Sequence, residues 1–287
     1  MPLLEVTGLN LFLRSSQGTV QALRHLSFKL ERGSSLGIIG ESGCGKSLTV
    51  QTLMGLQPDN ASVTGSMLWN GQELLGQNER DWQALRGNRM AMIFQEPMTA
   101  LNPLHTVGHQ VAEPLRHHKG LDQASALKAA IALLERVGIA NASARAKDYP
   151  HQFSGGQRQR ITIAMALACE PDLLIADEPT TALDVTVQQQ ILDLINDVAA
   201  ERNMALILIS HDLGLISQNV DDILVMYGGQ IVESGPTAAI FRHMAHPYTR
   251  GLLAARPRLD APRQPSGKPF DLFTIPGNVP AMQNLPS

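Results

Sequence analysis

The sequence predicts an α/β fold whose core carries an N-terminal antiparallel β subdomain, a helical subdomain insertion and a short C-terminal extension. Three observations predict it. A predicted strand leads into the glycine-rich loop "GESGCGKS" (40–47), and a predicted helix follows the loop. The buried strands "DLLIAD" (172–177) and "MALILIS" (204–210) flank a helical pattern at 185–201. The stretch between these two parts, residues 98–168, is mostly helical in pattern.

We therefore expect residues 1–97 and 169–240 to form the core with its β subdomain. Residues 98–168 are expected to form the helical subdomain, and residues 241–287 the extension. After about residue 240 the chain is rich in Pro, Arg and Ser, so we expect the extension to be loosely structured.

The N-terminal strands are predicted at "LLEVTGL", "LNLFLR", "VQALRHLSFKL" and "SLGIIG", with a turn at "SSQG" (15–18). After Lys46 a helix is predicted with Val50, Leu53 and Met54 on one face. A second hairpin at 63–75 is expected to turn at Asn70 and Gly71.

Asp122 precedes an apolar pattern of Leu127, Ile131, Leu134 and Val137, and Gly138 follows it. Asp at the N-cap and Gly after the last turn are typical of an amphipathic helix. The stretch "ILVMYGGQIVESG" (223–235) predicts another hairpin, with its turn at Gly228 and Gly229.

The composition excludes several classes of protein. Aromatic residues make up 4% of the 287 residues and the formal net charge is −3, so we expect no nucleic-acid partner. The N-terminus has no signal-peptide pattern, and no apolar run approaches the ~20 residues of a membrane helix. We expect a soluble chain in a reducing compartment, which reaches a membrane only through a partner.

The loop at 40–47 matches the full phosphate-loop pattern G-x-x-x-x-G-K-[ST]. Gly40, Gly43 and Gly45 let backbone N–H groups turn inward around phosphate oxygens, and the helix N-terminus adds partial positive charge. We expect Lys46 to reach the β- and γ-phosphates of a nucleotide and Ser47 to bind Mg²⁺.

Polar side chains follow three further apolar strands. Asp177 and Glu178 end "LLIADE", Gln95 closes "MAMIFQ" and His211 follows "LILIS". Ligands of open α/β sheets bind at the carboxyl ends of the strands, so we expect these side chains beside the phosphate loop. Asp177 would bind the metal, Glu178 would deprotonate the attacking water, and Gln95 would reach Mg²⁺ or that water.

A second stretch, "FSGGQRQR" (153–160), also has the composition of a phosphate-binding loop that opens a helix. Ser154 and the N–H groups of Gly155 and Gly156 would form an anion cradle at a helix N-terminus. One nucleotide does not need two such loops from one chain.

Together these pieces resemble, in order and over nearly the whole chain, the P-loop NTPase that forms the ATPase subunit of ABC transporters. "GESGCGKS" is similar to Walker A, Gln95 to the Q-loop, "FSGGQ" to the signature, "LLIADE" to Walker B, "ALD" (182–184) to the D-loop and His211 to the switch histidine. The resemblance implies ATP and Mg²⁺ as cofactors and ATP hydrolysis as the reaction. Its catalytic residues would be Glu178, His211 and Gln95, with Ser47, Gln95 and Asp177 on the metal. The nucleotide would contact Gly40, Glu41, Ser42, Gly43, Cys44, Gly45, Lys46, Ser47, Leu48, Phe12, Ser154, Gly155, Gly156, Gln157 and Asp184.

The resemblance also explains the second loop. In ABC ATPases two subunits sandwich two nucleotides, and each signature loop serves the nucleotide bound to the facing subunit. Dimerisation on ATP binding and separation after hydrolysis then make a mechanical cycle.

The finer resemblance is to the oligopeptide/dipeptide/nickel branch of importers. It rests on "MIFQEPMTALNP" (92–103), "YPHQFSGGQRQR" (149–160), "LLIADEPTTALDVTVQ" (173–188), "HPYTRGLL" (246–253) and "TIPGNVP" (274–280). Some relatives carry an iron–sulfur cluster on cysteines in the C-terminal extension. Here Cys44 and Cys169 both lie outside the extension, so we expect no such cluster.

Two details of the site stay open. Phe12 is expected to stack on adenine, with Leu13 as the alternative position and a plain core role for Phe12 as the other reading. Cys44 lies inside the phosphate loop, and we interpret it as a small neutral filler rather than a redox group.

The resemblance implies an importer ATPase that energises di- or oligopeptide uptake, with nickel, glutathione or another small solute as the alternative cargo. Its partners would be two transmembrane permease subunits, a second ATPase that is identical or paralogous and, indirectly, an extracytoplasmic solute-binding protein. It would lie peripherally on the cytoplasmic face of the bacterial inner membrane. A nucleic-acid or translation ABC protein is disfavoured, because this chain has no second ATPase domain, zinc insert or long coiled coil.

Overall fold

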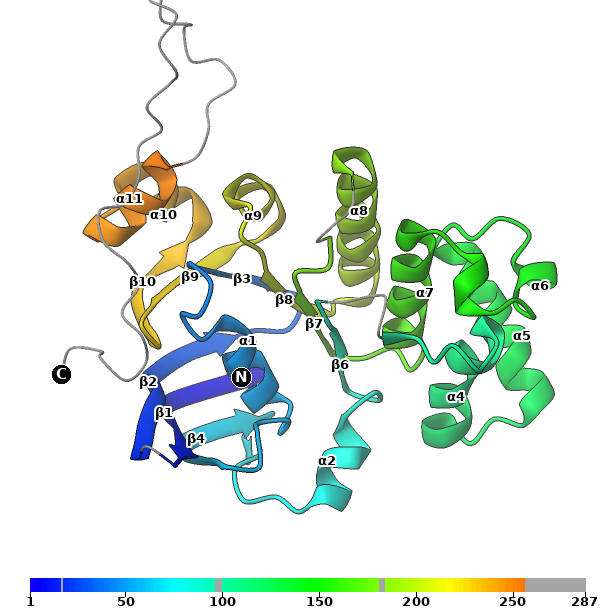
Figure 1. Cartoon of the computed structure of the whole chain (residues 1–287), viewed down its shortest axis with the longest axis horizontal. Coiled ribbons are helices and arrows are strands. Elements are labelled where there is room, and N and C mark those ends of the chain that lie inside the picture. The colour runs from blue at the N-terminus through cyan, green and yellow to red at the C-terminus, as the bar shows by residue number, and fades with distance from the viewer. Residues whose placement is uncertain (17, 96–99, 181–183, 256–287) are drawn as a thin grey trace, which may run out of the picture.

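A six-stranded sheet forms the centre of the computed structural model, which describes residues 1–16, 18–95, 100–180 and 184–255 (Figure 1). Its strand order is β10-β9-β3-β8-β7-β6, and β10 alone is antiparallel to its neighbour. The strands are β3 (Ser35–Ile39), β6 (Met90–Ile93), β7 (Leu173–Asp177), β8 (Ala205–Ile209), β9 (Asp222–Tyr227) and β10 (Gln230–Pro236). The parallel strands end at one edge of the sheet, as predicted for the βα pattern.

The N-terminal β subdomain is a four-stranded antiparallel sheet of order β2-β1-β4-β5. Its strands are β1 (Leu4–Ser15), β2 (Gly18–Leu30), β4 (Ala61–Trp69) and β5 (Gln72–Glu73). Ser15 pairs with Gly18 where β1 reverses into β2, as the predicted turn requires, and the hairpin at Asn70 and Gly71 is confirmed. The two strands predicted before residue 15 are one strand, because β1 continues through register shifts between Val6 and Phe12 that absorb the irregular pattern.

A shared core packs the β subdomain against one face of the central sheet. Helix α1 (Lys46–Leu53) contributes Val50 and Leu53 to this core, which confirms the predicted apolar face. Helices α8 (Val185–Arg202) and α9 (Leu213–Asn219) cover the opposite face, on the side of the sheet away from β1, β2 and β4 (Figure 1). A short helix that the sequence analysis did not anticipate, α2 (Glu79–Leu85), buries Trp82 against Gly55.

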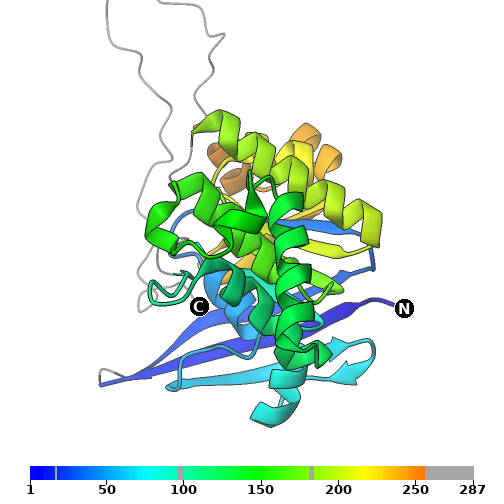
Figure 2. The same ribbon diagram turned by 90° about the vertical axis from the view of Figure 1, so that its right-hand side faces the viewer.

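The predicted helical subdomain is present as a group of helices beside β6, and Figure 2 shows it from the front. It consists of α4 (Val107–Lys119), α5 (Gln123–Arg136), α6 (Ala142–Arg145), the 3₁₀ helix η1 (Pro150–Gln152) and α7 (Gly155–Leu167). Asp122 caps α5 as expected, since its carboxylate accepts the N–H groups of Ala124 and Ser125.

The predicted apolar face of α5 is confirmed at Leu134 and Val137, which are buried, and Ile131 packs against the same core, but the prediction is wrong at Leu127. The helix buries Ala126, Ala130 and Leu134, whereas Leu127 is 37% exposed. These three residues repeat every four positions and so share one face. Small alanine side chains let α5 approach its neighbours α4 and α7 closely, so Ala126 and Ala130 occupy the centre of the buried face and Leu127 lies at its exposed margin.

The expectation of a loosely structured extension is wrong for residues 241–255. Helices α10 (Thr237–His243) and α11 (Pro247–Ala254) form there, and Tyr248 of α11 is buried. The Glu233 carboxylate of β10 accepts the N–H groups of Ala245 and His246 and so fixes the connection between the two helices. The motif at 274–280 lies outside the described residues, and no described helix is long and apolar enough to cross a membrane.

Candidate nucleotide site

The phosphate loop connects β3 to α1 and has the backbone that its glycines predict. Gly40, Gly43 and Gly45 have φ values of 151°, 80° and 103°, which side-chain-bearing residues rarely adopt. A Cβ atom on Gly40 would lie 2.3 Å from the carbonyl oxygen of Met226 on β9. The loop is therefore held directly against the central sheet at this point, and only glycine fits there.

Lys46 is 7% exposed and points back into the phosphate loop. Its Nζ donates to the carbonyl oxygens of Gly40 (2.7 Å) and Glu41 (2.9 Å). The ammonium group thus lies at the centre of the loop, where β- and γ-phosphate oxygens could replace these carbonyls as its partners.

Cys44 is fully buried behind the same loop, and its Sγ lies 3.8 Å from Lys46 Nζ. Burial raises the pKa of the Cys44 thiol, although the nearby Lys46 ammonium lowers it. A buried neutral thiol matches the interpretation of Cys44 as a small filler, and its side chain points away from the open part of the site.

Asp177 ends β7 and is 4% exposed. Burial raises the pKa of its carboxyl group and the neighbouring Glu178 raises it further, while a hydrogen bond with the Ser47 hydroxyl and the charge of Lys46 oppose the shift. Its Oδ1 is buried without a hydrogen-bond partner among the described residues. A buried carboxylate oxygen that lacks a partner and a hydroxyl beside it are the hard oxygen donors that Mg²⁺ prefers, so this pair fits the metal.

Gln95 and His211, which follow strands β6 and β8, meet at the carboxylate of Glu178, which follows β7. Gln95 Nε2, after β6, donates to Glu178 Oε2 at 3.0 Å, and His211 Nδ1, after β8, lies 3.4 Å from the same oxygen. Glu178 itself has a φ of 48°, and its N–H donates to the carbonyl of Ile209 on β8. The sequence predicted that these side chains would meet, and the parallel register of β6, β7 and β8 brings them together.

Gln95, Glu178 and His211 line one cavity of about 540 Å³ together with the phosphate loop. Its lining residues are Gly40, Glu41, Ser42, Gly43, Gly45, Lys46, Ser47, Leu48, Gln95, Glu178, His211 and Leu252. The cavity can hold a polyphosphate on the loop, a cation beside Ser47 and Asp177, and a water next to Glu178.

Two residues beside the loop, Tyr248 and Leu252 of α11, were missed by the sequence analysis. Leu252 lines the cavity, and the Tyr248 hydroxyl accepts the Glu41 N–H at 2.9 Å. No local pattern signals a contact between residues that are 207 positions apart in the chain.

The signature loop lies at the N-terminus of α7 (Figure 1). Ser154 caps α7: its hydroxyl oxygen accepts the Gln157 N–H, and the Gln157 Oε1 accepts the Ser154 N–H in return. Gly156 packs against Val187 in the first turn of α8. Among the described residues, 154–157 contribute nothing to the lining of their own chain's cavity. The structure therefore does not bring this second loop to the first within one chain.

Asp184 caps α8 by accepting the Val187 N–H at 2.9 Å, and the rest of the expected D-loop, 182–183, lies outside the described residues. Phe12 and Leu13 are half-buried on β1, and neither lines the described cavity. Their role toward adenine stays a prediction.

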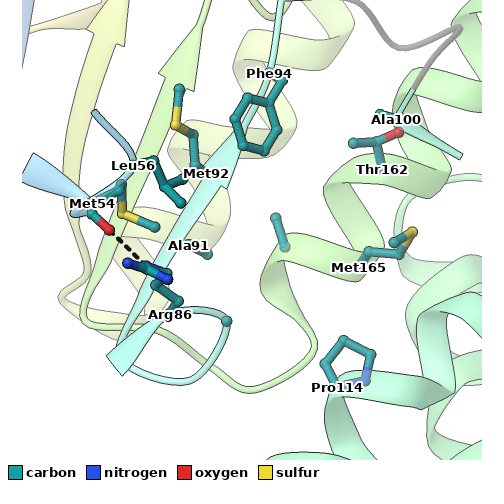
Figure 3. Close-up of a pocket in the computed structure, with 12 residues that line it drawn as sticks. Met54, Leu56, Arg86, Ala91, Met92, Phe94, Ala100, Pro114, Thr162 and Met165 are labelled. Atoms are coloured by element: carbon teal, nitrogen blue, oxygen red, sulfur yellow. Dashed lines mark hydrogen bonds between the residues drawn. The ribbon is translucent and has the colours of Figure 1, made fainter. Parts of the chain in front are cut away.

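A second, larger cavity of about 640 Å³ lies between the central sheet and the helical subdomain, and Figure 3 shows its lining. Leu56, Met92 and Phe94 face Pro114 of α4 and Met165 of α7 across an opening. Most of this lining is apolar. We call this cavity the subdomain groove.

Comparison with known proteins assigns the chain to a protein family. The family model described as "ABC transporter" matches residues 23–181, and the model described as "Oligopeptide/dipeptide transporter, C-terminal region" matches residues 232–287. The chain therefore belongs to the ABC transporter family of ATP-binding proteins, and it is an ATPase of the kind that is coupled to transport.

The curated relatives are similar over nearly the whole chain. The oligopeptide transport ATP-binding protein OppD of Salmonella typhimurium is 48% identical over 284 residues, which cover 99% of this chain and 83% of OppD. The dipeptide transport ATP-binding protein DppD of Lactococcus lactis is 47% identical, with coverage of 99% and 80%.

Solved structures support the fold. CbiO1 from Clostridium perfringens, part of the transporter complex CbiONQ, has a TM-score of 0.71 and 26% identity over 85% of this chain and 92% of its own. A dimeric ATP-binding cassette bound to ADP and Pi, MJ0796, has a TM-score of 0.73 and 23% identity, covering 82% of this chain and 98% of its own. The predicted P-loop NTPase fold with its added subdomains is thus confirmed.

Proposed function

We propose that this chain is the ATP-hydrolysing subunit of an importer for dipeptides or oligopeptides. The observation that carries the ATPase part is the single cavity in which the phosphate loop faces Gln95, Glu178 and His211. The peptide part is supported by the match of residues 232–287 to the oligopeptide/dipeptide C-terminal region and by the names of the relatives.

In the proposed reaction, the loop N–H groups and Lys46 hold the phosphates of ATP. Ser47 and Asp177 would hold Mg²⁺, and Gln95 would reach either the metal or the water. When bound, Mg²⁺ would neutralise charge on the phosphates. Glu178 accepts the proton of the attacking water, while Gln95 and His211 hold the Glu178 carboxylate in place at its Oε2 atom.

We further propose that two such ATPase subunits, identical or paralogous, close around two nucleotides. Ser154, Gly155, Gly156 and Gln157 then contact the γ-phosphate held by the facing subunit, and Asp184 lies near the same junction. The position of this loop outside its own chain's cavity supports this arrangement.

The subdomain groove is the surface that we propose for contact with the permease subunits (Figure 3). Its apolar lining suits an amphipathic helix of a membrane subunit. Gln95 follows Phe94, which is 45% exposed in the groove, so movement there reaches the nucleotide site directly. The chain would then work peripherally at the cytoplasmic face of the bacterial inner membrane, with a solute-binding protein acting only through the permeases.

We also retain the proposed division of the chain into a core (1–97 and 169–240), a helical subdomain (98–168) and an extension (241–287), which begins with ordered helices. The same machinery would serve an importer of nickel, glutathione or another small solute, because an ATPase subunit of this type does not contact the cargo.

The test is reconstitution in liposomes of this chain with the permeases and binding protein that co-purify with it. ATP hydrolysis should rise when the binding protein carries a di- or oligopeptide, and labelled peptide should accumulate inside. Stimulation by nickel or glutathione but not by peptides would change the cargo. Absence of co-purifying membrane subunits would contradict the importer role.

A further inference from the structure

Helix α11 touches the back of the phosphate loop. Tyr248 is 8% exposed, and its hydroxyl oxygen accepts the Glu41 N–H at 2.9 Å. Leu252, one turn further along the same helix face, lines the nucleotide cavity. The region matched to the oligopeptide/dipeptide C-terminal family therefore contacts the site where the nucleotide is expected.

The hydrogen bond from Glu41 defines the orientation of one peptide plane. The Glu41 N–H and the Gly40 C=O belong to the same peptide unit, so they point in opposite directions. Tyr248 holds the N–H side, and Lys46 Nζ holds the C=O side at 2.7 Å. Rotation of this plane away from Tyr248 would remove a carbonyl that positions the Lys46 ammonium.

Tyr248 is itself firmly held. Its ring packs on the ring of Tyr227 at the end of β9, with 4.7 Å between centroids. The His246 imidazole accepts the Tyr248 N–H at 3.2 Å and so caps α11. Burial raises the pKa of the Tyr248 hydroxyl above its ordinary value, at which a phenol is already neutral at physiological pH. The hydroxyl thus offers the loop a fixed acceptor.

We propose that Tyr248 is a positioning residue of the nucleotide site, which holds the Gly40–Glu41 peptide so that Lys46 is aligned for phosphate. Nucleotide binding and the docking of α11 are then coupled. By linkage, a docked α11 strengthens nucleotide affinity by the same factor by which bound nucleotide stabilises the docked helix. This inference rests on the proposed nucleotide site, and it assigns a role at that site to the C-terminal region of the chain.

The test compares Tyr248→Phe with the matched control Tyr227→Phe in the full chain. Both changes keep the aromatic ring pair, and only the first removes the acceptor for Glu41. Affinity for ADP with Mg²⁺ is measured by calorimetry, because ADP has a β-phosphate and avoids ATP-driven dimerisation. We expect Tyr248→Phe to weaken affinity about 2- to 12-fold, the range for the net loss of one hydrogen bond, and Tyr227→Phe to leave it unchanged.

Calorimetry separates this role from a merely structural one. Partly unfolded protein lowers the binding stoichiometry, whereas a misaligned loop lowers the affinity of every folded molecule. An unchanged affinity for Tyr248→Phe, or an equal loss in both variants, would overturn the proposal. Failure of the wild-type chain to bind ADP would instead contradict the proposed function.

Hydrogen exchange of the wild-type chain decides the matter independently, even where Tyr248→Phe does not fold. With saturating ADP and Mg²⁺, amides of residues 248–254 should exchange more slowly, by the same factor by which docking of α11 strengthens ADP affinity. Amides of α5, which lies outside the cavity, serve as the internal control. Equal exchange of α11 with and without ADP would overturn the coupling.

Discussion

The Glu178→Gln substitution tests the proposed chemistry with little change in shape. In the structure, Glu178 Oε2 takes a hydrogen bond from Gln95 Nε2 at 3.0 Å and lies 3.4 Å from His211 Nδ1. A glutamine keeps an amide oxygen that can accept from Gln95, so the cavity should keep its geometry. It cannot take up a proton from water. Loss of a general base costs roughly 10²–10⁴ in rate, or about 2.7–5.4 kcal/mol in barrier height at 1.36 kcal/mol per tenfold.

The assay is steady-state ATP hydrolysis with Mg²⁺, together with ATP affinity by calorimetry. We expect the rate to fall by at least about 10² while the affinity stays near that of the wild type. Glu135→Gln, which removes an exposed carboxylate of α5 away from the cavity, should change neither. A Glu178→Gln variant that keeps more than about a third of the wild-type rate would assign the base elsewhere.

Three further perturbations address binding, docking and stability. Lys46→Ala should weaken ATP affinity in calorimetry, since it removes the buried ammonium from the loop; unchanged affinity would mean that the backbone N–H groups suffice. Leu56→Arg should reduce co-purification with the permeases, because Leu56 lines the subdomain groove. Leu121→Arg, which changes a similarly exposed leucine outside the groove, should not reduce it. Equal retention of the permeases by both variants would place the contact elsewhere. Burial would raise the pKa of Glu73, but hydrogen bonds from the Ser66 hydroxyl and from backbone N–H groups lower this pKa overall. The ionised Glu73 carboxylate therefore stabilises the fold at neutral pH. This stabilisation is lost as the pH falls through the depressed pKa. Glu73→Gln should therefore lower the unfolding free energy by about 1–3 kcal/mol at pH 7 in urea titrations, with a difference that shrinks in acid; a constant difference would contradict this.

The meeting of Gln95, Glu178 and His211 with the phosphate loop in one cavity could be predicted from the sequence, because each part has a local signal. Each of Gln95, Asp177 and His211 follows an apolar strand, and parallel strands bring their carboxyl ends to one edge of the sheet. The glycines of the phosphate loop could be placed for the same reason, since a positive φ and a tight approach to β9 depend on residue type.

What the sequence did not predict depends on contacts between distant segments. The buried face of α5 was set by the close packing of Ala126 and Ala130, which a count of large apolar residues overlooks. The C-terminal helices were missed because the Pro- and Arg-rich stretch at 256–269 determined the interpretation of everything after residue 240, although Tyr248 packs against Tyr227 and the loop at Glu41. The periodicity of apolar residues along a segment does not indicate which distant segment it contacts, here one about two hundred residues away.

The most direct test of the composite site is the mass of the chain by light scattering, with and without ATP and Mg²⁺, for Ser154→Arg in a Glu178→Gln background. Ser154 is exposed at the start of α7, outside its own chain's cavity, so an arginine should leave ATP affinity intact and block only the approach of a facing subunit. The parent Glu178→Gln chain, measured alone or with a paralogous ATPase where that is the natural partner, should form a dimer with ATP. The account predicts that the Arg variant stays monomeric with unchanged ATP affinity. A dimer that persists in the Arg variant, or a direct loss of affinity in the monomer, would contradict it.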